Sequence, residues 1–273
     1  MSGIMQAEES GLRYRRWEHA APEAVVLLIH GLGAHSERWT PLAEYFLAHS
    51  IVSYAVELKG FGEADGPKGH VDSFSTYFKD IHRLLDIIRK KHGEKKIFLL
   101  GESMGGLIAF VMGSTQPAIS DGLICLAPAF KSKLSFTPAH YVRMVLTLFY
   151  ARHKAFPLPF DASMCTRDEV WQQAIKTDTR EHRTASPQLL VNIAIQQICA
   201  HMVAKEIVLP VLFLLAGQDE IVDSRVSREI FNNLPGDDKL LIEYTKMHHS
   251  LSIDLERERV FNDILRWIDK RTQ

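Results

Sequence analysis

The sequence predicts a doubly wound α/β fold, with a mainly parallel central sheet flanked by helices and a helical insertion. Two observations lead to this prediction. Short, continuous apolar runs recur along the chain, as in strands that are buried on both faces. Segments with helical periodicity lie between several of these runs, and strands that alternate with helices usually pair in parallel. Ligands bind at the carboxyl ends of the strands in such sheets, so functional residues are expected there.

The apolar runs place the strands. Each run lacks the alternation of a strand that has one solvent-facing side, so each is expected to form a strand that is covered on both faces. The expected strands span residues 25–30, 51–57, 97–101, 122–127, 211–217 and 240–244.

The ends of two helices can also be placed. Thr40 and Pro41 supply an N-cap and a first-turn proline for a helix over residues 42–50. Ser73 can cap a second helix, which Gly93 ends. Its apolar residues recur at intervals of three or four, so one face is expected to pack on the sheet. They are Phe74, Phe78, Ile81, Leu85 and Ile88.

The alternation of strands and helices stops after Pro128 and resumes near residue 205. The intervening segment has helical or irregular patterns, four prolines over residues 138–187, and no convincing buried strand. We therefore expect residues 129–204 to form a helical cap, or lid, over the carboxyl ends of the strands. Residues 1–128 and 205–273 are expected to form the core domain.

The composition argues against several classes of function. The chain has 273 residues and a formal net charge of −1, and its charges are spread along the sequence, so no nucleic-acid-binding face is expected. Cys125, Cys165 and Cys199 lie far apart, which favours neither disulfides nor a zinc site. The histidines include no His-Glu-x-x-His pair, so no metal is expected.

Targeting and membrane signals are not evident. The N-terminal residues lack the charged start, apolar middle and cleavage site of a signal peptide, so we expect a cytoplasmic protein. The longest apolar stretch, residues 142–150, has about half of the ~20 residues that cross a bilayer, and Arg143 and Thr147 interrupt it. No transmembrane helix is expected.

Ser103 ends one expected strand, within Gly-Glu-Ser-Met-Gly-Gly. If the chain turns sharply there into a helix that starts near Met104, Ser103 must adopt a strained backbone angle. Side chains at Gly101 and Gly105 would then collide with neighbouring chain. The turn holds the serine hydroxyl at the edge of the sheet and places the Met104 N–H at a helix N-terminus, where it can stabilise a developing oxyanion. Ser103 is therefore the candidate nucleophile.

A serine nucleophile needs a base, and the base needs a carboxylate that orients it. Asp219 follows the expected strand at 211–217, and His248 and His249 follow the strand at 240–244. The order serine, aspartate, histidine along the chain is the one expected of hydrolases with this kind of serine turn.

A second oxyanion donor is expected in the turn after the strand at 25–30. His30-Gly31-Leu32-Gly33 stands there, and the Leu32 N–H would point into the site. A plain glycine turn is the alternative reading of this segment.

Five segments together resemble a known family: HGLGAHSERW, GFGEADGPKGHVDSF, GESMGG, AGQDEIVD, and the His-x-Leu-x-x-Asp run at His249. They are similar to the monoacylglycerol lipase and lysophospholipase group of α/β-hydrolases, and the likeness extends from about residue 25 to the C-terminus. The resemblance implies an α/β-hydrolase fold and a serine esterase. It also implies that Ser103 is the nucleophile, that Asp219 and His249 complete the triad, and that Leu32 and Met104 are the oxyanion donors.

Two positions depart from that group. Residues 57–62 read Glu-Leu-Lys-Gly-Phe-Gly where the group commonly has Asp-x-Arg-Gly-x-Gly, and Glu102 stands where it usually has histidine. Neither change removes a catalytic group. Both alter the local electric field and the pocket, so details of the substrate transfer less safely than the mechanism.

Two candidates have close competitors. The spacing from Tyr244 and the Ser-Leu-Ser-Ile-Asp run that follows favour His249 over His248 as the base, on the pattern of the group. Asp223 competes with Asp219, but it precedes a helical segment, where an N-cap is its expected role.

The expected reaction is hydrolysis of a carboxylic ester through an acyl-enzyme, on monoacylglycerols, lysophospholipids or similar medium- or long-chain monoesters. It requires no cofactor. Cleavage of a thioester, an amide or a carbon–carbon bond by the same triad is the alternative among enzymes. A non-catalytic, ligand-binding protein of the same fold is the alternative outside enzymes. The sequence leaves the natural substrate and the oligomeric state open.

One part of the cap is more apolar than a surface helix requires. In the helix that Thr137 is expected to cap, apolar residues cover most of the circumference. Burial among other cap helices is one explanation. The other, which the resemblance supports, is that Val145, Leu148 and Phe149 line an acyl pocket above Ser103 and that the cap contacts a membrane surface.

Overall fold

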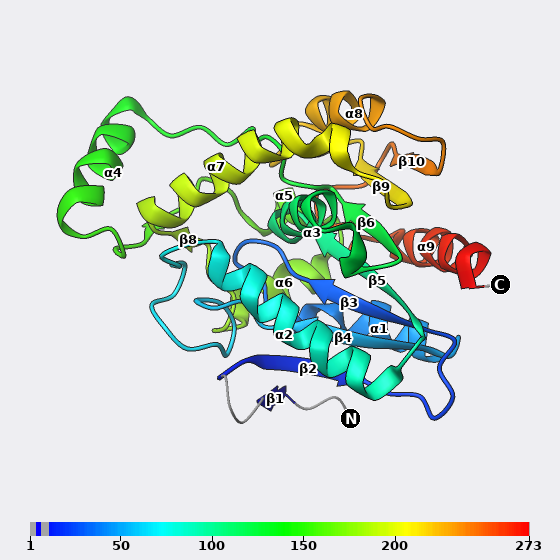
Figure 1. Ribbon diagram of the computed structural model, residues 1–273. Helices are drawn as coiled ribbons and strands as arrows, with labels where there is room; N and C mark the ends of the chain where they lie inside the picture. Colours follow the sequence, from blue (N-terminus) through cyan, green and yellow to red (C-terminus); the bar gives the residue numbers. More distant parts are fainter. Residues whose placement is uncertain (1–3, 7–10, 273) are drawn as a thin grey trace.

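The computed structural model describes residues 4–6 and 11–272, and the remaining N-terminal residues and Gln273 lie outside it. Within the described residues, the central strands form one sheet in the order β1-β2-β4-β3-β5-β6-β9-β10 (Figure 1). β2 is antiparallel to both β1 and β4, and the other neighbours are parallel. The mainly parallel sheet that the sequence predicts is confirmed.

The six predicted strands are present, and each agrees with its apolar run to within one residue at either end. They are β3 (Ala24–Ile29), β4 (Ile51–Val56), β5 (Lys96–Glu102), β6 (Gly122–Leu126), β9 (Val211–Ala216) and β10 (Lys239–Tyr244). The sequence did not predict β1 (Ile4–Gln6) and β2 (Arg13–Trp17). β2 contains three arginines and no apolar run, so the pattern used for the central strands does not detect it.

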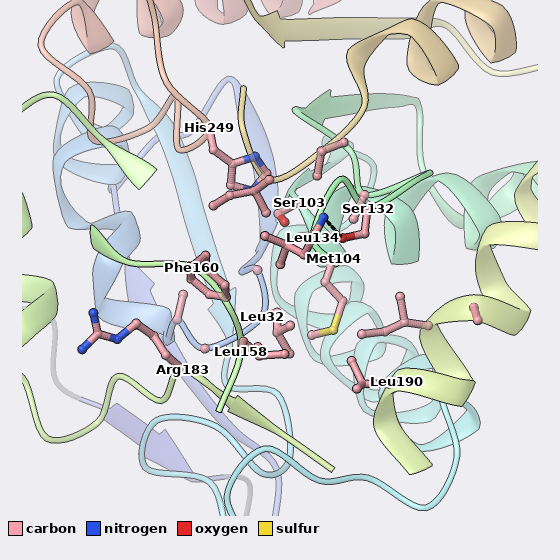
Figure 2. Close-up of a pocket in the computed structure, with 18 of the residues that line it drawn as sticks. Leu32, Ser103, Met104, Ser132, Leu134, Leu158, Phe160, Arg183, Leu190 and His249 are labelled. Carbon is pink, nitrogen blue, oxygen red and sulfur yellow. Dashed lines mark hydrogen bonds between the residues drawn. The ribbon is translucent and has the colours of Figure 1, made fainter. Parts of the chain in front are cut away.

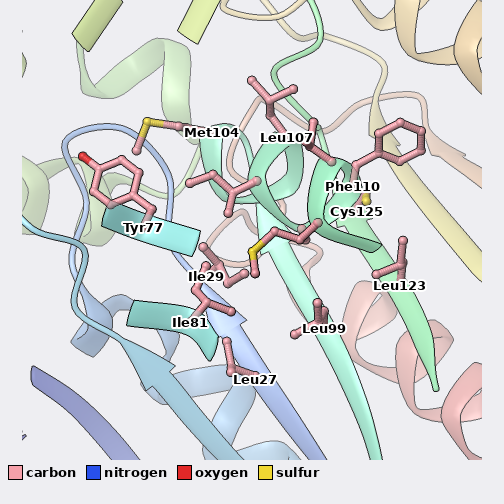
Figure 3. Close-up of a cluster of buried hydrophobic side chains, with 14 of the residues drawn as sticks. Leu27, Ile29, Tyr77, Ile81, Leu99, Met104, Leu107, Phe110, Leu123 and Cys125 are labelled. Carbon is pink, nitrogen blue, oxygen red and sulfur yellow. The ribbon is translucent and has the colours of Figure 1, made fainter. Parts of the chain in front are cut away.

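Helices cover both faces of the sheet. One face packs against α2 (Ser75–His92), α3 (Met104–Thr115) and α8 (Ser224–Asn232), and the other packs against α1 (Thr40–Leu47) and α9 (Arg257–Thr272). Figure 3 shows side chains of α2 and α3, among them Tyr77, Ile81 and Leu107, above the strand residues Leu27 and Leu99. Short 3-10 helices lie at η1 (Ser36–Trp39), η2 (Pro117–Ile119) and η3 (Ala204–Glu206).

The predicted N-cap at Thr40 is wrong. η1 leads directly into α1, so Thr40 is already helical, and its hydroxyl donates to the Glu37 carbonyl at 2.7 Å instead of accepting from a backbone N–H. α2 starts at Ser75, and Ser73 Oγ accepts the Ser75 N–H at 3.2 Å. Gly93 ends that helix, as predicted, with φ at 60°.

The segment between β6 and β9 contains α4 (Pro138–Tyr150), α5 (Ala162–Cys165), α6 (Glu169–Thr177) and α7 (Pro187–Val203). It also contains β7 (Phe156–Pro157) and β8 (Thr184–Ala185), a short antiparallel pair that the sequence did not predict. The predicted cap at Thr137 is confirmed, because its side chain accepts the His140 N–H. α4 stands at the outer edge of the molecule (Figure 1) and contacts α7.

Candidate active site

Ser103 lies between β5 and α3 with φ 58° and ψ −118°, a conformation that residues with a side chain rarely adopt. The glycines around it permit this turn. A Cβ at Gly105 would lie 2.0 Å from the Ile29 carbonyl oxygen, and a Cβ at Gly101 would lie 2.1 Å from the Gly105 oxygen. Only glycine fits at either position, so the tight strand-turn-helix connection expected from the sequence is present and presents Ser103 beyond the end of β5.

Asp219 and His249 form a buried pair. His249 Nδ1 and Asp219 Oδ2 are 2.8 Å apart. Asp219 follows β9, and its Oδ1 accepts the N–H groups of Ile221 and Val222 at 2.9 and 2.8 Å. These bonds fix the carboxylate, and the carboxylate fixes the imidazole with its proton on Nδ1. The Nε2 atom of His249 is thereby left to act as an acceptor.

The surroundings of Asp219 and His249 stabilise the charged form of each side chain. Burial raises the pKa of Asp219, but the charge and hydrogen bond of His249 and the two backbone N–H groups outweigh burial and bring this pKa below its ordinary value. Burial lowers the pKa of His249, but the Asp219 carboxylate outweighs burial and raises it. The site therefore keeps Asp219 ionised and makes His249 a stronger base than a free imidazole.

The competing residues have other partners. His248 Nδ1 lies 2.8 Å from the Ser163 carbonyl oxygen, and the His248 N–H donates to Asp254 at 2.8 Å. Asp223 accepts the Arg225 N–H and is the N-cap of α8, as the sequence predicts. Neither His248 nor Asp223 belongs to the buried pair described above.

Ser103 and His249 line one cavity of about 410 Å³. Figure 2 shows them together at one end of it, Ser103 from the turn after β5 and His249 from the loop after β10. Leu32, Met104 and Leu190 of α7 lie along the same cavity. The cavity thus lies between the core and residues 129–204.

Leu32 and Met104, the two predicted oxyanion donors, lie on turns that adjoin Ser103. Met104 is the first residue of α3, where backbone N–H groups have no partner within the helix. Leu32 lies in the turn after β3, and this turn packs against the Ser103 turn. A Cβ at Gly31 would be only 3.1 Å from the Ser103 Cβ. Both residues line the cavity beside Ser103.

The three pocket residues predicted on α4 separate into two groups. Val145 and Leu148 line the cavity, together with Tyr141 and Met144, which places the lining residues at helical spacing on one face. The prediction of Phe149 as a pocket residue is wrong. Its side chain is 86% exposed and is not part of the cavity wall, because it lies on the outward face of α4.

The cavity also has charged groups, of which the sequence analysis singled out Glu102 but neither Arg38 nor Glu181. Arg38 in η1 donates from Nε to Glu181 Oε1 at 3.0 Å, and both side chains line the wall. Glu102 lines the wall beside Ser103 and accepts from Ser252. Arg38 belongs to a motif that the sequence analysis quoted, but its partner lies 143 residues away and no local pattern indicates the pair.

The remaining walls are mainly apolar and come mostly from residues 129–204. They include Leu134, Phe136, Leu158, Phe160, Leu190, Val191, Ile193 and Ala194. Among the described residues, no group of three or more His, Cys, Asp or Glu is placed to hold a metal ion. No helix in the described part of the chain is long and apolar enough to cross a membrane.

Comparisons with known proteins give consistent results. A family model described as serine aminopeptidase, S33, matches residues 20–256. The chain is 25% identical to the monoglyceride lipase of Homo sapiens, over 98% of this chain and 90% of that protein. It is 27% identical to the phospholipase YtpA of Bacillus subtilis, over 90% of this chain and 95% of that protein. The crystal structure of a monoacylglycerol lipase from Paleococcus ferrophilus superposes with a TM-score of 0.86, at 25% identity, over 95% of this chain and 99% of that chain.

Proposed function

The chain belongs to the serine aminopeptidase S33 family of α/β-hydrolases, and we propose that it is a serine carboxylic-ester hydrolase acting on monoacylglycerols, lysophospholipids or similar long-chain monoesters. The observation that carries the proposal is the strained Ser103 in a largely apolar cavity that it shares with His249, whose imidazole is paired with the buried Asp219. The similarity to lipases and a phospholipase supports esters, rather than peptides, as the substrate class.

In the first half of the proposed reaction, Ser103 Oγ attacks the ester carbonyl carbon while His249 Nε2 accepts the serine proton. Asp219 stabilises the imidazolium that forms. The carbonyl oxygen becomes negative and accepts hydrogen bonds from the Leu32 and Met104 amides. When the tetrahedral intermediate collapses, the ester C–O bond breaks and His249 gives its proton to the departing alcohol, leaving the acyl group on Ser103.

In the second half, a water molecule attacks the acyl-enzyme carbonyl and gives one proton to His249. The same two amides hold the oxyanion. Collapse of this intermediate breaks the bond to Ser103 Oγ, which recovers the proton from His249, and the carboxylic acid leaves. Each step uses side chains and backbone groups of this chain and water, so the proposal requires no cofactor.

The cavity supports a long acyl chain. Its apolar wall extends from Ser103 past Leu158 to α4 and α7. Transfer of one methylene group from water to an apolar wall is worth about 0.8 kcal/mol. Because residues 129–204 cover the cavity as a cap, a single acyl chain is easier to admit than the three chains of a triacylglycerol.

Contact between the cap and a lipid surface is part of the proposal. The outward face of α4 exposes Val142, Leu146, Phe149 and Tyr150, and α7 exposes Ile198 and Met202. An apolar surface of this kind, next to the cavity, suits an enzyme that takes substrate from a lipid aggregate.

A substrate panel tests the proposed function. We would compare kcat/KM on 1-monoacylglycerols, lysophospholipids, acyl thioesters, peptides and triacylglycerols. The proposal predicts the highest values for monoacyl esters with medium or long chains and low values for triacylglycerols. Turnover confined to peptides or thioesters would contradict it.

A further inference from the structure

Glu102 joins the two parts of the chain that carry the reacting groups. It is the last residue of β5 and immediately precedes Ser103. Its Oε1 accepts the Ser252 N–H at 3.0 Å, and its Oε2 accepts the Ser252 hydroxyl at 2.9 Å. Ser252 lies three residues after His249 in the loop between β10 and α9. One carboxylate therefore connects the nucleophile turn to the loop of the base.

The Glu102 carboxylate is buried beside the reacting groups. Glu102 is 4% exposed, Ser252 is 1% exposed, and Glu102 lines the cavity with Ser103 and His249. A carboxylate is costly to bury unless its oxygens accept hydrogen bonds. Here both oxygens accept hydrogen bonds from Ser252, in the loop that carries His249. The buried carboxylate therefore holds this loop in place and also brings a negative charge close to His249.

We propose that Glu102 is a positioning residue for the reaction. Its hydrogen bonds to Ser252 hold the His249 loop against the Ser103 turn, and its negative charge stabilises the imidazolium that His249 becomes during each half-reaction. This inference rests on the proposed function, since it assigns Glu102 a task only if His249 is the base. It supplies His249 with a second anionic neighbour besides Asp219.

The other ionisable groups near Glu102 and His249 are consistent with this role. Arg38 in η1 faces both His249 and Glu102, and its charge is offset by the salt bridge to Glu181. Cys165 of α5 also faces Glu102, but burial raises the pKa of this thiol to about 11, so it stays neutral. The negative charge of Glu102 is thus not cancelled locally by an unpaired cation. Burial is the largest influence on Glu102 and raises its pKa above the ordinary value, and the Ser252 bonds and the charge of His249 oppose this rise only in part.

Glu102→Gln separates the charge of this side chain from its shape. A glutamine oxygen can still accept the Ser252 N–H, and its amide can donate to the Ser252 hydroxyl. With a soluble monoester, we expect plateau kcat to fall about tenfold and the acid limb of the kcat/KM profile to move to lower pH, because a negative neighbour that raises the pKa of His249 is lost. KM should change little. An acid limb at the wild-type pH, with wild-type kcat, overturns the proposal.

Two further variants test the role of the Glu102–Ser252 hydrogen bonds in holding the His249 loop, separately from the charge of Glu102. Glu102→Asp keeps the charge on a shorter arm that cannot reach both Ser252 groups, and Ser252→Ala removes one of the two bonds. Each should lower kcat severalfold while the acid limb stays at the wild-type pH. Because Ser252→Ala keeps the Glu102 side chain and its bond to the backbone N–H of residue 252, it gives an independent test if Glu102→Gln does not fold. Wild-type kcat in folded Ser252→Ala would overturn the mechanical role.

Glu57→Gln is the matched control. Glu57 is also buried and accepts two backbone N–H groups, from Ser36 at 2.9 Å and Glu63 at 2.8 Å, but its carboxylate is not among the groups that shift the pKa of His249. The acid limb of the kcat/KM profile of Glu57→Gln should match that of the wild type. Ser103→Ala is measured alongside, because activity retained there contradicts the proposed function itself. Activity lost in Ser103→Ala, with an unchanged profile in Glu102→Gln, contradicts only the role of Glu102.

Discussion

Ser103 has a backbone conformation that costs free energy, and its neighbours show how the chain sustains it. A residue in such a conformation typically costs about 1–3 kcal/mol. The glycines at 101 and 105 let β5, α3 and the end of β3 approach more closely than any side chain would allow. Close packing of these segments therefore maintains the strained conformation of Ser103. In this conformation the serine hydroxyl points into the cavity, near the imidazole of His249.

At the same scale, the two adjacent histidines should differ sharply. His249→Ala removes the partner of Asp219 and should lower kcat by about 10⁴-fold or more. His248→Ala removes only a contact with the Ser163 carbonyl and should retain kcat within a few-fold of the wild type. Steady-state hydrolysis of a soluble ester, with circular dichroism as the check on folding, compares the two. Greater loss in His248→Ala would reverse the assignment of the base.

The pH dependence of the rate should reflect the Asp219–His249 pair. His249 must be neutral to accept the serine proton, and Asp219 raises the pKa of His249 above the ordinary imidazole value of about 6.5. kcat/KM should therefore rise with pH through an apparent pKa above ~6.5 and then level off. In Asp219→Asn, the raising charge is absent, so the residual activity should have its acid limb at lower pH. An identical acid limb in wild type and Asp219→Asn would argue that another group is the base.

At the scale of elements, α4 has two apolar faces with different surroundings. Leu148 lines the cavity, whereas its neighbour Phe149 points away from it. Helical geometry turns adjacent residues by about 100°, so a run of apolar residues necessarily supplies both faces. The sequence pattern showed that α4 was too apolar for a simple surface helix, but it did not distinguish the cavity face from the outer face.

The two faces predict different effects of the same substitution. Leu148→Asp places a carboxylate on the acyl wall and should flatten the rise of kcat/KM with acyl length, which otherwise amounts to about fourfold per methylene. Phe149→Asp makes the same change on the exposed face and should leave the chain-length dependence on soluble monomeric esters unchanged. A p-nitrophenyl ester series below micelle concentrations measures both. Equal flattening in the two folded variants, or none in Leu148→Asp, would contradict the assigned faces.

The central strands were the most predictable elements because they are apolar on both faces and the sheet buries their runs, whereas the run of the edge strand β10 is only partly buried. β2 was missed for the opposite reason. It is near the edge of the sheet, and its Arg15 is an ionic partner of Glu37 and Glu63 rather than part of an apolar run. The chain order of Ser103, Asp219 and His249 was readable from the sequence because each follows a recognisable strand.

At the scale of the whole molecule, the features that escaped prediction join distant segments. Arg38 pairs with Glu181 across the cavity wall, and Arg167 pairs with Asp254 at 2.8 Å beside the His249 loop. Glu102 meets Ser252 at a separation of 150 residues. Local patterns carry no information on such pairs, which form only when segments far apart in the sequence come together in the folded chain. The cavity exists for the same reason, since both parts of the chain supply its walls.

The most direct test of a serine esterase is covalent capture of its nucleophile. A fluorophosphonate probe reacts with a serine that a neighbouring base activates, and peptide mass spectrometry locates the adduct. We predict one adduct per chain, on Ser103, with labelling lost in Ser103→Ala and strongly slowed in His249→Ala. Labelling elsewhere in the chain, or an unlabelled Ser103 in folded wild-type protein that still hydrolyses esters, would contradict the account.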